Sequence, residues 1–337
     1  MSEVPDEDLV TVVVPALDEE QFLGHCLDSI RAQDHRNLQI VVVDGGSTDD
    51  TVGVIRRAMA ADDRVELLHS PRRNIPTSLN LAVAQARAPW LVRVDAHSIV
   101  DPTYVRRSVT RLVEDSWGGV GGRKDGVGRT PAGRAIAVAM ASRFGVGNST
   151  YHHGTEVQEV DHIPFGAYPV ELVRDLGGWD ETLTANEDFE FDYRLRQAGK
   201  RLLFDPAIAI KWHCRQSIRE LFSQYRRYGR GKVDVAVVHP DSMRPRHFVP
   251  PLFVAYVVVG ALAWYRRPVR LLMLVLPYAF AVGVASVETG RQLDAAGDRA
   301  RLPLAFAAMH IGWGLGFWAG VGATVATRAR RRLRERV

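Results

Sequence analysis

The 337-residue sequence predicts an α/β fold built on a mostly parallel sheet, followed by C-terminal membrane helices. Two observations predict this fold class. Before residue 245, short apolar runs alternate with amphipathic stretches, which is typical of βα units. After residue 245, three stretches carry almost no charge, which is typical of helices that lie in a membrane.

Four apolar, β-branched runs in the first hundred residues predict strands. Because both faces of each run are apolar, these strands belong in the middle of a covered sheet. They are expected at residues 9–16, 38–46, 65–71 and 90–96. Helices are expected between them, at residues 19–33, from Ser47 or Thr48 as the N-cap onward, and at residues 75–88.

Three later segments have distinct patterns. The glycine-rich run at 118–129 lacks the strand-to-helix setting of a dinucleotide-binding fingerprint, so we expect a flexible loop there. Residues 131–160 predict an amphipathic helix and a polar loop, which suit an acceptor-facing or membrane-surface element. Residues 186–199, "NEDFEFDYRLRQAG", predict a helix whose acidic start is favoured by the helix dipole.

The apolar stretches near the C-terminus are residues 248–265, 269–287 and 302–326. Flanking arginines and aromatic residues favour a membrane over a buried bundle in a soluble protein. The last two stretches are long enough to cross a hydrocarbon core of roughly 30 Å. We expect these two to cross and the first, which is the shortest and holds Pro250 and Pro251, to lie in the interface or to re-enter. Three crossings would put the arginine-rich tail and the N-terminal domain on opposite sides, against the positive-inside tendency.

The formal net charge of +4 is concentrated at the C-terminus. Residues 328–337 hold six arginines and one glutamate, a net +5, and subtracting this from +4 leaves −1 for the rest. The basicity is therefore local, and we expect no nucleic-acid partner. Two cysteines cannot form a disulfide framework and suit a reducing compartment. The acidic residues 1–9 do not have the pattern of a signal peptide.

Polar residues follow each predicted strand, in the segments "VPALDEE", "VDGGSTDDT", "SPRRN" and "VDAH". The ligands of an open parallel sheet bind in the crevice outside the carboxyl ends of its strands. Four polar strand ends in one alternating βα segment therefore predict a ligand site.

Five ordered motifs across residues 9–235 resemble family 2 glycosyltransferases with the GT-A fold. They are "TVVVPALDEEQFLGHCLDSI", "IVVVDGGSTDDT", "VRVDAH", "NEDFEFDYRLRQAG" and "QYRRY". The resemblance implies a GT-A nucleotide-sugar-binding domain that transfers a sugar from a nucleotide diphosphate with inversion. Within the family, "VRVDAH", "PFGAY" and "NEDFEFDYRLR" are similar to the bacterial exopolysaccharide glucosyltransferases of the succinoglycan type.

The resemblance and the change in composition together imply four parts. They are an N-terminal tail (1–9), a GT-A domain (10–245, with a nucleotide-binding half 10–97 and an acceptor half 98–245), a membrane-associated helical region (246–327) and an arginine-rich cytoplasmic tail (328–337).

On the donor side, the resemblance implies that Asp44 accepts the imide proton of a uracil ring. The residues expected to line the nucleotide-sugar are Pro15, Ala16, Glu19, Asp44, Arg73, Asn80, Asp95 and Ala96. The family often has a further aspartate where Gly45 stands, so the source of the ribose contact stays open. A surface charge is the alternative interpretation of Arg73.

Asp95 and His97 are expected to hold a divalent cation, Mn²⁺ or Mg²⁺, which neutralises the leaving diphosphate. Carboxylate oxygen suits both ions, and an imidazole shifts the preference toward manganese. Most of the family has an aspartate at the position of His97. Whether His97 binds the metal or a phosphate, or is a solvated residue at a strand end, therefore stays open.

Inverting transfer needs a carboxylate that deprotonates the acceptor hydroxyl opposite the leaving group. Asp188 matches the family's base, and Glu187 is expected to position it or the sugar. An acidic helix start without catalytic function is the alternative, and Glu190 and Asp192 are further candidates for the base.

The motif "QYRRY" supplies the remaining site residues. Arg227 is expected to stabilise the departing diphosphate, and Gln224 and Tyr228 are expected to hold the acceptor sugar. Tyr228 stands where the family has a tryptophan.

These expectations combine into one function. The chain is expected to be a metal-dependent, inverting enzyme in the inner (plasma) membrane, with its catalytic domain in the cytoplasm. It would move a hexose, with glucose preferred, from a UDP-sugar to a polyprenyl-diphosphate-linked saccharide in exopolysaccharide or cell-envelope synthesis, in contact with membrane lipids. The alternatives are a processive polysaccharide synthase, a nucleotide-dependent oxidoreductase, which would need glycines where "PALDEE" follows the first strand, and a catalytically inactive membrane scaffold.

Overall fold

The computed structural model describes residues 8–334, with side chains through residue 329, and contains two compact units. The first unit comprises Met1–Asp125 and Thr150–His213, and the second comprises Gly126–Ser149 and Cys214–Val337. Most of the expected N-terminal tail and the end of the arginine-rich tail lie outside the described residues. The four expected parts of the chain stay predictions.

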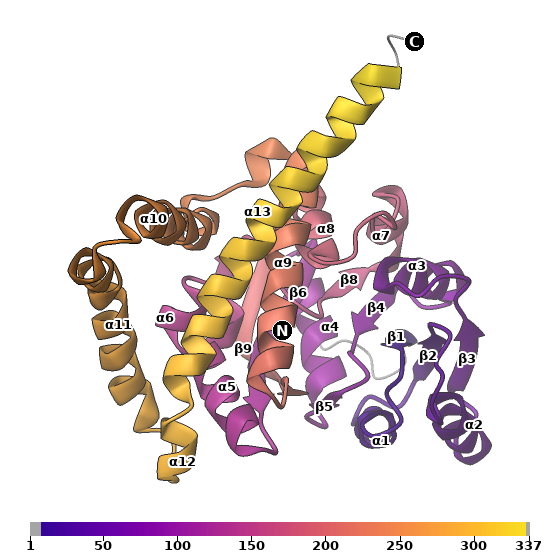
Figure 1. Cartoon of the computed structure of the whole chain (residues 1–337). Helices are drawn as coiled ribbons and strands as arrows, with labels where there is room; N and C mark the ends of the chain where they lie inside the picture. The colour runs from indigo at the N-terminus through magenta and orange to yellow at the C-terminus, as the bar shows by residue number, and fades with distance from the viewer. Residues whose placement is uncertain (1–7, 335–337) are drawn as a thin grey trace. The chain divides into compact units, whose positions relative to one another are not determined.

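A nine-stranded sheet forms the centre of the first unit, in the order β3-β2-β1-β4-β8-β6-β9-β5, with β7 paired to β9 (Figure 1). β1 pairs in parallel with β2 and β4, and β2 pairs in parallel with β3. β8 pairs antiparallel with β4 and β6, and β9 pairs antiparallel with β5 and β7, so the sheet is mixed. The α/β fold class predicted from the alternating pattern is confirmed. The strands are β1 Val10–Ala16, β2 Leu38–Asp44, β3 Val65–His69, β4 Trp90–Arg93, β5 Ser98–Val100, β6 Gly119–Val127, β7 Gln158–Val160, β8 Ala167–Pro169 and β9 Leu202–His213.

Helices follow the parallel strands as the βα pattern predicts. Those of the first unit are α1 Leu23–Arg31, α2 Thr51–Ala61, α3 Ile75–Gln85, α4 Tyr104–Glu114, α7 Val170–Asp175 and α8 Glu187–Gln197, with the 3₁₀ turn Thr150–His152. The expected start of α2 at Ser47 or Thr48 is wrong. The backbone N–H of Ser47 donates to Asp44 and that of Thr48 donates to Asp18, so these residues form a turn before the helix.

The glycine-rich segment expected as a loop is instead strand β6, so that prediction is wrong. A Cβ on Gly122 would overlap the carbonyl oxygen of Ile208 in β9, and a Cβ on Gly121 would crowd Ile163. The glycines are therefore required by close packing within the sheet, where a larger side chain would not fit.

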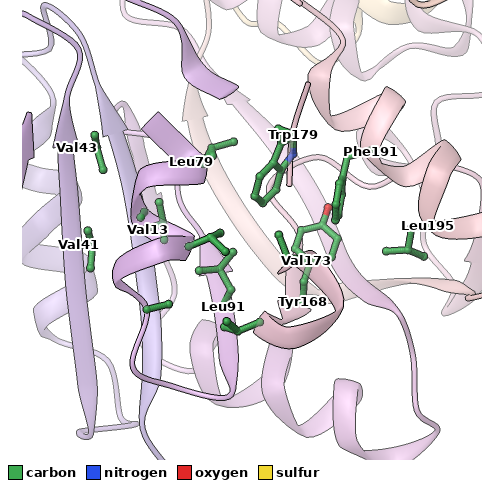
Figure 2. Close-up of a cluster of buried hydrophobic side chains, with 14 of the residues drawn as sticks. Val13, Val41, Val43, Leu79, Leu91, Tyr168, Val173, Trp179, Phe191 and Leu195 are labelled. Atoms are coloured by element: carbon green, nitrogen blue, oxygen red, sulfur yellow. The ribbon is translucent and has the colours of Figure 1, made fainter. Parts of the chain in front are cut away.

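The main core of the first unit lies between the sheet and helices α3, α7 and α8. Figure 2 shows Trp179, Tyr168 and Phe191 grouped beside Leu79 and Leu91. Trp179 and Phe191 stack with ring centroids 4.8 Å apart, and Tyr168 meets Phe191 edge-on at 5.3 Å. Aromatic pairs of this kind stabilise by about 0.5–1.5 kcal/mol beyond their buried area. This packing secures the start of α8, where the candidate base lies.

The second unit is helical in its described part. Its helices are α5 Pro131–Ala141, α6 Arg143–Val146, α9 Ile218–Val238, α10 Val249–Trp264, α11 Pro268–Gly290, α12 Ala296–Arg299 and α13 Leu302–Arg334, with short 3₁₀ turns at Pro240–Ser242 and Pro245–His247. The helix expected within residues 131–160 is confirmed as α5.

Three stretches of this unit are long and apolar enough to cross a membrane: Pro245–Trp264, Pro268–Gly290 and Ala296–Ala329. Large apolar side chains on α10 and α11 point outward, with Leu262 73% exposed and Phe280 74% exposed. Contiguous exposed apolar surface of this extent is unfavourable in water and marks a membrane or protein contact. The structure thus supports membrane association of these helices.

Helix α13 packs along α9 within the second unit (Figure 1). Gly312, Gly316 and Gly320 repeat every fourth residue on α13 and face the backbone of α9 near Phe222, Arg226 and Arg230. Small residues at this spacing let two helix backbones approach closely. The capping box of Ser217 and Glu220 defines the start of α9.

Candidate active site

The candidate site lies where the order of the parallel strands reverses. β1 has β2 on one side and β4 on the other, so the crevice outside the carboxyl ends of β1 and β4 is the topological switch point. Glu19 follows β1 and His97 follows β4, and their side chains meet with Oε1 and Nδ1 2.8 Å apart. The two strand ends predicted to share a site therefore converge.

Strand β4 ends at Arg93, earlier than expected, so Asp95 and His97 lie in a turn. The backbone N–H of Ser98 donates to the carbonyl of Asp95 at 3.0 Å. Ala96, between them, is 1% exposed. The side chains of Asp95 and His97 therefore project from a turn instead of from an extended strand.

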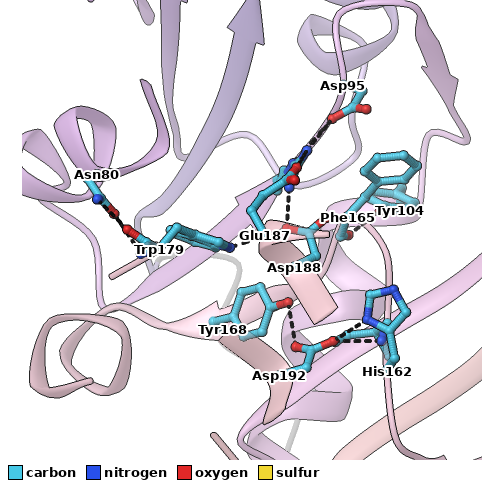
Figure 3. Close-up of polar contacts among 12 residues, drawn as sticks. Asn80, Asp95, Tyr104, His162, Phe165, Tyr168, Trp179, Glu187, Asp188 and Asp192 are labelled. Carbon is cyan, nitrogen blue, oxygen red and sulfur yellow. Dashed lines mark hydrogen bonds and ion pairs between the residues drawn. The ribbon is translucent and has the colours of Figure 1, made fainter. Parts of the chain in front are cut away.

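Four charged residues form what we call the Arg93 cluster: Arg93, Asp95, Glu187 and Asp188. Arg93 donates to Asp95 Oδ1 from Nε at 3.2 Å and from Nη2 at 3.1 Å, and its Nη1 pairs with Asp188 Oδ1. Nη2 also lies 3.6 Å from Glu187 Oε1. Figure 3 shows how Asp95, after β4, and the start of α8 approach each other around this cluster. The candidate metal ligand and the candidate base thus contact the same guanidinium.

The charges in the cluster do not balance, because one guanidinium faces three carboxylates. Burial raises the pKa of Asp188 to about 7, with Arg93 lowering it and Glu187 raising it. Burial also disfavours the cation, but the carboxylates of Asp188, Asp95 and Glu187 raise the pKa of Arg93 above its ordinary value. Arg93 therefore stays charged, and the raised pKa of Asp188 makes its protonated form more populated near neutral pH than that of an ordinary aspartate.

Two hydrogen bonds to the Asp188 carboxylate reach the same oxygen. Oδ1 accepts from Arg93 and from the indole N–H of Trp179, the latter at 3.2 Å, and the side chain is 14% exposed. No hydrogen bond within the described residues engages Oδ2. This arrangement holds Oδ1 in place and leaves Oδ2 able to accept a further hydrogen bond.

The alternative bases, Glu190 and Asp192, are occupied by structural contacts. Glu190 accepts from Arg194 Nε at 2.6 Å and from Nη2 at 2.9 Å. The fully buried Asp192 accepts from His162 Nδ1 at 2.7 Å, the Ile163 backbone N–H at 2.8 Å and the Tyr168 hydroxyl at 3.2 Å (Figure 3). Neither carboxylate is placed to accept a proton from a substrate, which favours Asp188.

Asp44, the candidate base-recognition residue, closes β2 and is buried. Its carboxylate accepts the backbone N–H groups of Gly46 and Ser47, each at 3.1 Å. Burial raises its pKa, but hydrogen bonds from Ser47, Gly46 and His69 outweigh this and lower it below the usual value. Asp44 is therefore an ionised acceptor, which suits the imide N–H of a pyrimidine.

Three other residues predicted to line the nucleotide-sugar, Pro15, Ala16 and Arg73, lie at the end of β1 or beside the turn after Asp44. Pro15 and Ala16 end β1, and the Ala16 carbonyl accepts the backbone N–H of Gly45 at 2.8 Å. Arg73 is half exposed and donates to the Gly46 carbonyl at 2.8 Å and to Asp18 at 3.0 Å, so it lies beside the Asp44 turn.

Asn80 joins α3 to the segment that holds Trp179. Its side-chain amide donates to the Trp179 carbonyl at 2.9 Å and its oxygen accepts the Trp179 backbone N–H at 2.8 Å (Figure 3). The amide also donates to Glu181 at 3.1 Å. These bonds tie α3 to the segment before α8. Contact of Asn80 with a nucleotide-sugar stays a prediction.

The residues at the switch point fit a divalent cation that shares its coordination with a substrate. Within the described residues, no group of three or more His, Cys, Asp or Glu side chains could hold a metal by itself. Mg²⁺ and similar hard cations are commonly held by one or two carboxylates together with substrate phosphates. Asp95 and His97 are such a partial set. Glu19 would accept the Nδ1–H of His97 and leave Nε2 as the ligand, an arrangement frequent among metal-binding histidines.

Gln224, Arg227 and Tyr228 lie on α9 in the second unit. The side-chain amide of Gln224 donates to the Tyr228 hydroxyl at 3.0 Å, while Gln224 Oε1 is buried and has no hydrogen-bond partner within the described residues. An unpaired buried acceptor costs about 1–3 kcal/mol, so a ligand that donates to it would be stabilised. The predicted role of this motif in acceptor binding stays a prediction.

Arg93 and Trp179 are site residues that we did not predict from the sequence. The signal for Arg93 was present, because an arginine inside the apolar run "WLVRV" must pair with acids when the strand is buried. Nothing in the local pattern indicates that the Trp179 indole, part of the core, also donates to Asp188.

Comparison with known proteins agrees with the geometry. A family model described as glycosyl transferase family 2 matches residues 11–164, and one described as glycosyl transferase family group 2 matches residues 166–328. The succinoglycan biosynthesis protein ExoA of Rhizobium meliloti is 30% identical over 310 residues, which cover 91% of this chain and 93% of that protein. The chain belongs to glycosyltransferase family 2.

A further relative and two solved structures are also similar to the chain. The pre-mycofactocin glycosyltransferase of Mycobacterium tuberculosis is 28% identical over 261 residues, covering 70% of this chain and 49% of that protein. The mannosyltransferase PcManGT from Pyrobaculum calidifontis, in complex with GDP-Man and Mn²⁺, has a TM-score of 0.57 at 21% identity, covering 90% of this chain and 86% of that one. GalNAc-T7, with UDP, GalNAc and Mn²⁺, has a TM-score of 0.56 at 16% identity, and the match covers 73% of this chain and 51% of that one. The structures show that this family 2 enzyme has the GT-A fold.

Proposed function

We propose that this family 2 glycosyltransferase is a membrane-anchored, inverting hexosyltransferase. Its donor is a UDP-sugar, with UDP-glucose preferred, and its acceptor is a polyprenyl-diphosphate-linked saccharide in exopolysaccharide or cell-envelope synthesis. The observation that carries the proposal is the Asp188 carboxylate at the start of α8, held through Oδ1 with a raised pKa. The relative involved in succinoglycan biosynthesis supports the class of product.

The proposed reaction is a single displacement at the anomeric carbon. Asp188 Oδ2 takes the proton of the acceptor hydroxyl, and the hydroxyl oxygen forms a bond to the anomeric carbon. The bond from the carbon to the diphosphate oxygen breaks on the opposite face, and UDP leaves with both electrons. A base pKa near 7 favours this role, because the group is partly ionised at neutral pH and still accepts a proton readily.

Asp95 and His97 would hold the divalent cation, which neutralises charge on the leaving diphosphate when bound. Asp44 would accept from the uracil ring, and Pro15, Ala16, Glu19, Arg73, Asn80 and Ala96 would line the rest of the donor site. On α9, we propose that Arg227 stabilises the diphosphate and that Gln224 and Tyr228 bind the acceptor sugar.

Of the alternative functions, the oxidoreductase is excluded and the processive polysaccharide synthase is kept as a second candidate. Membership of glycosyltransferase family 2 rules out the nucleotide-dependent oxidoreductase. A processive polysaccharide synthase is the second candidate within the family. Within the described residues, three stretches are long and apolar enough to cross a membrane, and all three lie toward the C-terminus. Three crossings are few for a polymer channel, which favours addition of a single sugar.

A donor screen on the purified, membrane-reconstituted chain tests this function. Wild-type protein with a lipid-linked acceptor should release UDP from one UDP-hexose. Asp188→Asn should bind UDP with unchanged affinity by calorimetry yet lose about 10²–10⁴-fold in turnover, because the base is removed while the donor site is kept. Absence of UDP binding or release with every donor would refute the proposed function. Retained turnover in Asp188→Asn would refute the assignment of the base.

A further inference from the structure

Arg93 joins two parts of the site that are far apart in the sequence. It is the last residue of β4 and is 2% exposed, and its side chain reaches both the β4–β5 turn and the first turn of α8. The guanidinium also lies over the ring of Phe165, with Cζ 5.5 Å from the ring centroid. A buried arginine stays charged and needs anionic partners, which the Arg93 cluster supplies.

We propose that Arg93 is a positioning residue for glycosyl transfer, whose forked guanidinium orients the Asp188 carboxylate and links it to Asp95. This inference rests on the proposed function, which makes Asp188 the base and Asp95 a donor-side ligand. Nη1 meets Asp188 while Nε and Nη2 meet Asp95, so separate branches serve the acceptor and donor sides. Lysine has a single ammonium group and cannot bridge both carboxylates with this geometry.

The charge of Arg93 has a second effect on Asp188. The groups that face Asp188 are Arg93 from β4, Glu187 and Asp192 from α8, His162 from the segment before β8, and Tyr168 from β8. Arg93 is the only permanent cation among these five. Because a nearby cation favours the ionised carboxylate, its removal should raise the pKa of Asp188 and disfavour the active, deprotonated base.

Three variants of the full chain, reconstituted in lipid, test this inference. In Arg93→Gln, kcat at neutral pH should fall by about 100-fold, and the acidic limb of the kcat profile should move up by about one pH unit or more. In Arg93→Lys, the acidic limb of the kcat profile should lie nearer to that of wild type, because the positive charge is kept. Its kcat should still fall, because the ammonium group cannot contact both Asp188 and Asp95. Arg194→Lys is the matched control. Arg194 pairs with Glu190 on the same helix, so this variant should lower stability without moving the pH profile.

A direct titration separates this inference from the function on which it rests. In donor-free protein labelled with ¹³C at aspartate carboxyl groups, the Asp188 signal, assigned with Asp188→Asn, should titrate at higher pH in Arg93→Gln. If wild type transfers no sugar but this shift appears, the proposed function fails and the role of Arg93 in tuning Asp188 stands. A folded Arg93→Gln protein with wild-type titration of Asp188, or with wild-type kcat and pH profile, would overturn the inference.

Discussion

His97 has a defined environment that its sequence position alone leaves open. Nδ1 faces Glu19 Oε1 at 2.8 Å, and the ring packs near Trp212 with centroids 5.5 Å apart. Both contacts fix the orientation of the imidazole, and the carboxylate selects the tautomer with a proton on Nδ1. The interpretation of His97 as a solvated strand-end residue is therefore less favoured than a role in ligand binding.

The Glu19 contact can be tested through metal affinity. Glu19→Gln should weaken Mn²⁺ binding to the UDP complex by about 10–100-fold, because the orienting partner of His97 is lost. Calorimetric or spin-resonance titration of Mn²⁺ measures this directly. Glu20→Gln, at the next residue, is the control and should bind as wild type, and Asp95→Ala should abolish binding. Equal affinity in Glu19→Gln and Glu20→Gln would show that Glu19 does not position the ligand.

The pKa of Asp188 predicts how activity depends on pH. The base works in its ionised form, so kcat/KM should rise with pH along a limb centred near the free-enzyme pKa of about 7. Below this limb, the rate should fall by about tenfold per pH unit, following the ionised fraction. Initial rates across neutral pH at limiting donor provide the measurement. A profile that stays flat through this range is not compatible with Asp188 as the base.

Helix α9 carries the "QYRRY" motif, and α13 supports it. Four glycines bring the two helices together: Gly229 on α9, and Gly312, Gly316 and Gly320 on α13. The packing explains why α13 is half buried, while the apolar windows of α10 and α11 are only 22% and 17% buried. The third apolar stretch is therefore partly a packing element of the second unit as well as a candidate membrane helix.

Two glycine substitutions on α13 separate packing from helix propensity. A Cβ on Gly316 would overlap the Arg226 carbonyl oxygen, so Gly316→Ala should destabilise the protein by about 1–3 kcal/mol. No atom of the described residues lies within 4 Å of a Cβ built on Gly322, so Gly322→Ala should be neutral or stabilising by up to about 1 kcal/mol. Thermal unfolding in detergent compares the two. Equal melting temperatures would disprove the close α9–α13 contact.

The whole chain combines a GT-A domain with C-terminal helices that are long and apolar enough to cross a lipid bilayer. The described arginines of the C-terminal region include Arg266, Arg267 and Arg270 at the α10–α11 junction and Arg291, Arg299 and Arg301 around α12. Positive charge favours the cytoplasmic side. Arginines lie at both ends of α11, so these charges alone do not decide which end of the helix faces the cytoplasm. The positive charge of the C-terminal tail is needed to choose the orientation of the helices.

The expected orientation, with two crossings, predicts where the C-terminus lies. A reporter enzyme fused after Val337 should be active only in the cytoplasm, because α10 lies in the interface while α11 and α13 cross. A second fusion within the segment between α11 and α13, at Asp294, serves as the matched control and should report the opposite side. An extracytoplasmic signal from the Val337 fusion would mean that three helices cross.

Much of the fold could be predicted from local pattern, and the departures arise from contacts that the local pattern does not contain. The parallel strands and the helices after them follow from apolar periodicity. β6 was missed because its glycines, typical of loops, are required by contacts with Ile163 and Ile208, which are distant in sequence. The start of α2 was misplaced because Ser47 and Thr48 bond to Asp44 and Asp18 instead of capping the helix.

What the sequence predicts about the site differs from what only the tertiary structure shows, and the reason for the difference is physical. Periodicity is carried by neighbouring residues, so the sequence was enough to predict the fold class. The family and the candidate carboxylates Asp44, Asp95 and Asp188 followed from the resemblance of short motifs to family 2 glycosyltransferases, and such motifs are also carried by neighbouring residues. Side-chain pairing joins residues that only folding brings together, as Arg93 and Asp188 show. Tertiary structure alone therefore showed that Glu190 and Asp192 are occupied, that Glu19 faces His97, and that one guanidinium links the donor and acceptor carboxylates.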